Sequence, residues 1–80
     1  MVETQIAPRY RVSKAGTIEF IGGNPINCVV RNLSVTGAAI EVSDPAGIPE
    51  SFILVMPDDG LRLLCHTVWR TQYRIGVAFD

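Results

Sequence analysis

The segment Ile26–Val42, INCVVRNLSVTGAAIEV, decides how the chain folds. Its first residues alternate in side-chain character with the period of two that is typical of a β-strand, and its last six residues do the same. Between these two runs, Arg31–Gly37 replaces the alternation with residues that favour turns and form local hydrogen bonds. The segment therefore predicts two antiparallel strands joined at a polar corner.

Short apolar runs of the same kind recur along the chain, separated by Gly, Pro, Asn and Asp at about the 8–12-residue spacing of small β-domains. Strands are expected in the runs 16–22, 26–32, 37–42, 51–57, 61–70 and 73–79. Most connections are too short for parallel crossovers, and closing the sheet would remove its exposed edges. We predict an all-β fold: a small six-stranded antiparallel β-barrel without a C-terminal helix, over residues 9–80, after a flexible tail at residues 1–8.

The alternation also predicts which side chains enter the core. In the third and fifth expected strands the inward positions are Ala38, Ile40, Val42, Leu63, Cys65, Thr67 and Trp69. Ala39 is expected to point outward, and Trp69 is expected to belong to the core with Phe79. The clearest turn signal is Asp58–Gly60, because an Asp-Gly pair tolerates the backbone conformations of a tight hairpin.

Composition excludes several classes of function. The chain has 80 residues, 48% of them hydrophobic, and a net charge of −1, which suits one folded domain and gives no basic surface for nucleic acid. No apolar run reaches the length of about 18 residues that a membrane helix needs. We expect Cys28 and Cys65 to be buried free thiols and the location to be cytoplasmic. With His66 as the single histidine, neither a metal site nor an enzyme active site is expected.

The polar corner leaves two interpretations open. Asn, Ser and Gly are common in turns for structural reasons alone. In the functional interpretation, Asn32 and Ser34 share one side of the chain beside the cation of Arg31, and they bind a polar ligand with an anionic part. A second group of cations, Arg9, Arg11 and Lys14, lies within six positions near the N-terminus and could form a local anion site.

Asn32, Ser34 and Gly37 match the (D/N)xSxxG signature of PilZ domains, which are small bacterial β-barrels. The resemblance extends over most of the chain. It includes the lead-in PRYRVSKAG from residue 8, the apolar strand FILVMP from residue 52 and the closing pair VWR and RIGVAF. The sequence thus resembles the short, single-domain form of this family.

The resemblance implies a non-catalytic receptor for the second messenger cyclic di-GMP, with no other cofactor and with a downstream protein partner. Its binding residues at the motif positions would be Arg9, Asn32, Ser34 and Gly37, and Arg11 and Arg31 are nearby cations that could partly replace arginines missing from the motif. The family's N-terminal RxxxR motif, often preceded by another arginine, is incomplete here, because Gln5 and Thr4 stand where those arginines are expected. This departure supports the alternative of a degenerate PilZ-like adaptor that binds no nucleotide and acts by protein–protein contact.

Overall fold

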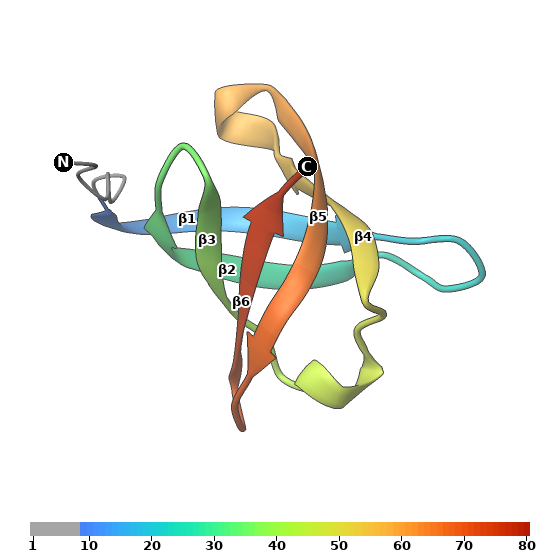
Figure 1. Ribbon diagram of the computed structural model, residues 1–80. Helices are drawn as coiled ribbons and strands as arrows, with labels where there is room; N and C mark the ends of the chain where they lie inside the picture. The colour runs from blue at the N-terminus through green and yellow to red at the C-terminus, as the bar shows by residue number, and fades with distance from the viewer. Residues whose placement is uncertain (1–8) are drawn as a thin grey trace, which may run out of the picture.

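A computed structural model describes residues 9–80, which form six β-strands and two short 3-10 turns (Figure 1). The strands are β1 (Tyr10–Glu19), β2 (Ile26–Leu33), β3 (Gly37–Glu41), β4 (Ser51–Met56), β5 (Leu61–Arg70) and β6 (Arg74–Phe79). All pairings are antiparallel, and the order β1-β2-β3-β6-β5-β4 closes into a barrel. The predicted all-β, six-stranded barrel is confirmed. The tail predicted at residues 1–8, with Thr4 and Gln5, lies outside the described residues.

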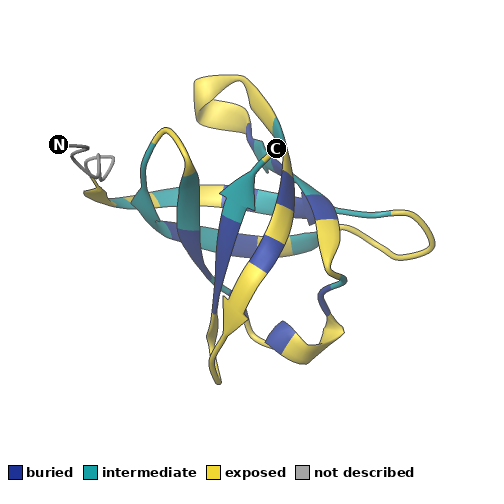
Figure 2. Ribbon diagram, viewed as in Figure 1, coloured by how far each residue is buried: buried dark blue, intermediate teal, exposed yellow. Residues whose placement is uncertain are grey.

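The interior is an apolar cluster with residues from all six strands, and the alternation of buried and exposed residues is clearest along β5 (Figure 2). Its largest fully buried side chains are Ile18, Ile40, Leu54, Met56, Ile75, Val30 and Cys65. Phe79 packs against this cluster, as expected. Period-two alternation therefore specified most of the core correctly, since one face of each strand must leave water for the barrel to close.

Both cysteines are free and buried, as predicted. Burial in the apolar interior raises the pKa of Cys28 to about 11, with a smaller contribution from the nearby Cys65 thiol. Burial also raises the pKa of Cys65 to about 11. Both groups are thus held as neutral thiols that pack as small apolar side chains.

The β4–β5 hairpin turns through η2 (Pro57–Asp59) and Gly60, in agreement with the predicted turn. Gly60 has φ of 65°, the left-handed conformation that glycine adopts without strain. Asp59 also binds Lys14 of β1, with Nζ–Oδ distances of 3.0 and 3.1 Å. The other 3-10 turn, η1 (Pro45–Gly47), lies in the connection from β3 to β4.

Three strand pairs contain a register shift: β1–β2, β2–β3 and β5–β6. Arg31 is an extra residue of β2 relative to β3, and Val68 is an extra residue of β5 relative to β6. In β1, Val12 and Ser13 together face the single residue Arg31. Such β-bulges reverse the alternation locally, so the side chains that follow them point to the face opposite to the one predicted.

No helix in the described part of the chain is long and apolar enough to cross a membrane.

Candidate binding site

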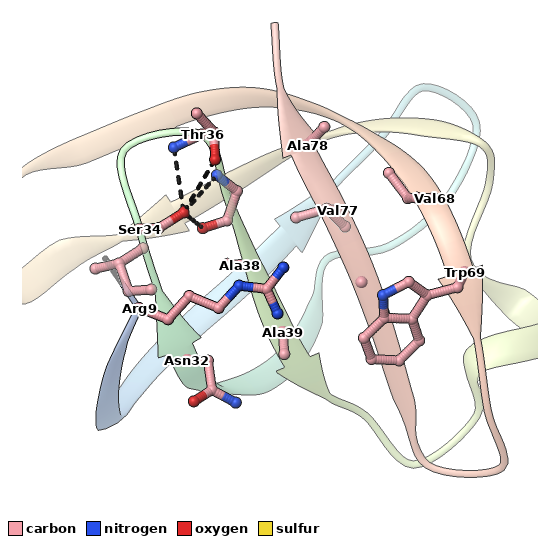
Figure 3. Close-up of a pocket in the computed structure, with 13 residues that line it drawn as sticks. Arg9, Asn32, Ser34, Thr36, Ala38, Ala39, Val68, Trp69, Val77 and Ala78 are labelled. Atoms are coloured by element: carbon pink, nitrogen blue, oxygen red, sulfur yellow. Dashed lines mark hydrogen bonds between the residues drawn. The ribbon is translucent and has the colours of Figure 1, made fainter. Parts of the chain in front are cut away.

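A pocket of about 220 Å³ lies on the outer face of β3 and β6 (Figure 3). Its floor consists of very small residues on neighbouring strands, in the cross-strand pairs Gly37–Ala78 and Ala39–Gly76. Val68 and Trp69 of β5 border one side, and the β2–β3 corner borders the other. A smooth floor between two raised walls suits a flat ring system.

Gly37 is required by the close approach of β3 to β6. A Cβ atom at this position would lie 2.2 Å from the carbonyl oxygen of Val77, well inside van der Waals contact. Its φ is negative, so the requirement is for space and not for a special backbone conformation. The glycine of the signature thus keeps the pocket floor flat where the corner meets β6.

Trp69 forms a wall of the pocket, and its predicted place in the core is wrong. Thr67 pairs with Val77, but Trp69 pairs with Gly76, so the extra residue Val68 turns the indole to the outside. A Cβ atom on Gly76 would lie 2.1 Å from this ring. The indole therefore lies flat over Gly76 and is 42% exposed. Gly76 has no side chain that would clash with an indole on the neighbouring strand. This glycine is the sequence signal that could have indicated the position of Trp69.

Ala39 points outward, as predicted, and it does not belong to the core cluster. It is nevertheless buried. It lies on the pocket floor between Arg9 and Trp69 (Figure 3). Sequence reasoning favoured the core over a stacking role for Trp69, and it did not single out Ala39, Val68 and Gly76, because small and apolar residues carry no chemical signature of binding.

Ser34 holds the β2–β3 corner in shape. Its hydroxyl oxygen accepts hydrogen bonds from the backbone N–H groups of Thr36 and Gly37, each at 3.2 Å (Figure 3). The hydroxyl can donate to the Gly37 carbonyl, also at 3.2 Å, and the Ser34 N–H donates to the same oxygen at 2.9 Å. The structural interpretation of the corner is therefore correct for Ser34, and the same bonds place the residue at the pocket wall.

Asn32 reaches the pocket because of the bulge at Arg31. Val30 faces the core, so regular alternation would have turned Asn32 inward as well, but the extra residue places it opposite Ala39 on the outer face. The side-chain hydrogen bonds around this corner among the described residues do not involve its carboxamide, and Figure 3 shows it directed away from the floor. One donor and one acceptor group are thus available at this wall.

The three predicted arginines occupy different places. Arg9 precedes β1 and extends its guanidinium over the floor of the pocket, beside Asn32 (Figure 3). Arg11 is exposed and pairs with Asn32 through the β1–β2 ladder, but it does not line the pocket. Arg31 does not line it either: its Nη2 donates to Glu41 Oε1 at 3.1 Å, and its Nη1 donates to Ser13 Oγ at 3.4 Å.

The electrostatics of the pocket favour an anion. Arg9 is the charged residue among the described lining residues, and no carboxylate is among them. In residues 9–80 no three His, Cys, Asp or Glu side chains gather in a way that could hold a metal ion. The described part of the site offers the guanidinium of Arg9, the carboxamide of Asn32, the indole face of Trp69 and a flat floor, a combination able to hold an aromatic ring that carries polar edges and a nearby negative charge.

The family model for the PilZ domain matches residues 5–80. The chain belongs to the PilZ domain family. PilZ domains are generally modules that bind cyclic di-GMP, and they serve as binding and adaptor modules and not as enzymes. A search of curated proteins found no match to this PilZ domain.

Proposed function

We propose that this PilZ domain is a non-catalytic receptor module for cyclic di-GMP in the bacterial cytoplasm. The observation that carries the proposal is the meeting of Asn32, Ser34 and Gly37 with Arg9 around one pocket. Asn32, Ser34 and Gly37 match the (D/N)xSxxG signature, and Arg9 stands at the last position of the incomplete RxxxR motif. The fold brings them together from two segments separated by more than one strand, as a binding site requires.

The chemistry of cyclic di-GMP matches the pocket. Each guanine is a flat ring with donors and acceptors on its edges, and each phosphodiester carries one negative charge. The carboxamide of Asn32 suits a guanine edge, while Arg9 suits a phosphate or a purine face. Trp69 adds an apolar wall against which a base can stack. Ser34 and Gly37 then act through the shape of the corner and the flatness of the floor.

The test is calorimetric titration of the chain with cyclic di-GMP, together with the fluorescence of Trp69, which is the single tryptophan. We expect binding that changes the indole emission. Arg9→Ala should weaken it about 10- to 100-fold, because one charge-assisted contact is lost. Arg62→Ala removes an arginine that lies outside the pocket and should change the affinity less than about twofold. Absence of binding at high micromolar ligand would contradict the proposal.

A degenerate adaptor is the second candidate. It is favoured by the single cation among the described lining residues and by the exposed side chains of Val35 and Val68 beside the pocket. The six described strands close into a barrel, so such an adaptor would bind its partner through side chains and not by adding a strand to a sheet edge. If only a Gln5→Arg variant bound cyclic di-GMP, the natural chain would lack the phosphate contact, and the adaptor would become the better explanation.

A further inference from the structure

A three-residue ion network borders the pocket on the same outer surface. Glu41 follows Ala39 by two positions on β3, and Arg74 precedes Gly76 by two positions on β6. Glu41 and Arg74 are cross-strand partners, and they form the next pair on this face after the Ala39–Gly76 pair of the floor, with the inward-facing Ile40–Ile75 pair between them. Two residues along a strand span about 7 Å, so the network lies one step beyond the pocket.

The carboxylate of Glu41 is held by two guanidinium groups from different strands. Arg31 Nη2 lies 3.1 Å from Oε1, and Arg74 Nε lies 3.6 Å from Oε2. Two arginines around one anion are also the arrangement that binds a phosphate group in many proteins. Glu41 thus occupies a place that a ligand phosphate could take.

The network can open at low cost. The side chains of Arg31, Glu41 and Arg74 are 38%, 36% and 45% exposed, and ion pairs at this exposure stabilise a fold only weakly. The Arg31 Nε is buried and has no hydrogen-bond partner among the described residues, so its guanidinium is not fully satisfied by Glu41 and Ser13. A stronger acceptor would be favoured there.

Cyclic di-GMP carries two phosphates, whereas the described lining of the pocket supplies one guanidinium, that of Arg9. We propose that Arg31 and Arg74 form a latent second phosphate site, which the carboxylate of Glu41 occupies in the unliganded protein. The inference rests on the proposed function. In this arrangement the ligand must displace Glu41, so Glu41 lowers the affinity of the receptor and sets the concentration at which it responds.

The test compares two carboxylates that each hold an arginine at 3.1 Å with nearly equal exposure, Glu41 and Glu19. Glu41→Gln frees Arg31 and Arg74 and should tighten cyclic di-GMP binding about tenfold. Glu19→Gln frees Arg62, which lies outside the pocket, and should change the affinity less than about twofold. Both variants remove one negative charge from the protein. The control therefore separates the effect of freeing Arg31 and Arg74 from the general gain in anion affinity that a less negative protein shows.

Double variants identify the cations. Arg31→Met or Arg74→Met in the Glu41→Gln background should remove the tenfold gain, because each variant deletes one of the two cations that the phosphate contacts. Two separate arginines keep the test valid if one variant fails to fold, which thermal melting reports. Binding by the natural chain with no gain in Glu41→Gln, or an equal gain in Glu19→Gln, overturns the inference while the proposed function stands. If neither the natural chain nor Glu41→Gln binds, both are overturned.

Discussion

The two sides of this barrel are built differently. The β4–β5 hairpin pairs Ser51–Met56 with Leu61–His66 without a register shift, and its alternate residues enter the core. Around the pocket, by contrast, the β1–β2, β2–β3 and β5–β6 pairs all contain shifts. Only the floor between them, the β3–β6 pair, is regular. Regular pairing builds the core, and interrupted pairing turns Asn32 and Trp69 to the surface where a ligand can reach them.

The largest difference in stability is expected between alanine variants of two aromatic residues, Phe52 on the hairpin side and Trp69 on the pocket side. Phe52 of the hairpin is 2% exposed in the core, so Phe52→Ala should lower the free energy of unfolding by about 3–5 kcal/mol. Trp69 is 42% exposed on the outer face, so Trp69→Ala should cost only about 1–2 kcal/mol despite its larger ring. Urea denaturation followed by circular dichroism measures both. Equal losses would mean that Trp69 serves the core after all.

The same contrast explains how well the sequence predicted the regular side and the pocket side of the barrel. Alternation indicated Cys28, Val30, Ile40 and Cys65 correctly, because a buried face imposes a period of two on the side chains. It failed at Trp69, because a bulge depends on the partner strand and leaves no reliable mark in one sequence. The candidate site was predicted only where its residues matched a family motif or carried a charge. That Arg31 binds Glu41 at the pocket's border could not be foreseen, because it depends on the register of β2 against β3 and on the bulge between them.

The next effect concerns the two cysteine thiols, whose titration tests whether water is excluded equally from the interior near β2 and near β5. Cys28 on β2 and Cys65 on β5 have pKa values raised to about 11 from a reference of 9.0, mainly by burial. The neutral thiol is favoured in the fold, so its stabilisation is complete below pH 9 and is lost as the pH rises to about 11. The loss should approach about 2–3 kcal/mol for each thiol.

The measurement is urea denaturation between pH 8 and 11 on the natural chain and on a Cys28→Ala, Cys65→Ala variant. The difference between the two stability curves isolates the thiols from other groups that titrate in this range. Parallel curves would show that water reaches the cysteines and that the interior is not closed.

A smaller effect separates two glycines that both have negative φ. Gly37→Ala should lower the free energy of unfolding by about 1–3 kcal/mol, because its Cβ would meet the Val77 carbonyl at 2.2 Å and push β3 from β6. Gly47→Ala in η1 is the matched control, since its Cβ would lie 3.4 Å from Asp44 Oδ2, at ordinary contact. The control should be neutral or stabilising by about 0.4–1 kcal/mol. Similar changes in the free energy of unfolding for the two variants would contradict the close approach of β3 to β6 that flattens the pocket floor.

The smallest effect is expected at the ion pair that joins the hairpin to β1. Lys14 and Asp59 lie 3.0 Å apart with side chains 35% and 32% exposed, and such pairs contribute about 0.2–1 kcal/mol. A double-mutant cycle of Lys14→Met and Asp59→Asn, measured by urea denaturation at low and high salt, gives this coupling directly. We expect a small coupling that salt screens further. A coupling above about 2 kcal/mol would mean that this surface ion pair holds the hairpin in place more than the packing of alternate residues from β4 and β5 does. The regular side of the barrel would then depend on local contacts as much as the pocket side does.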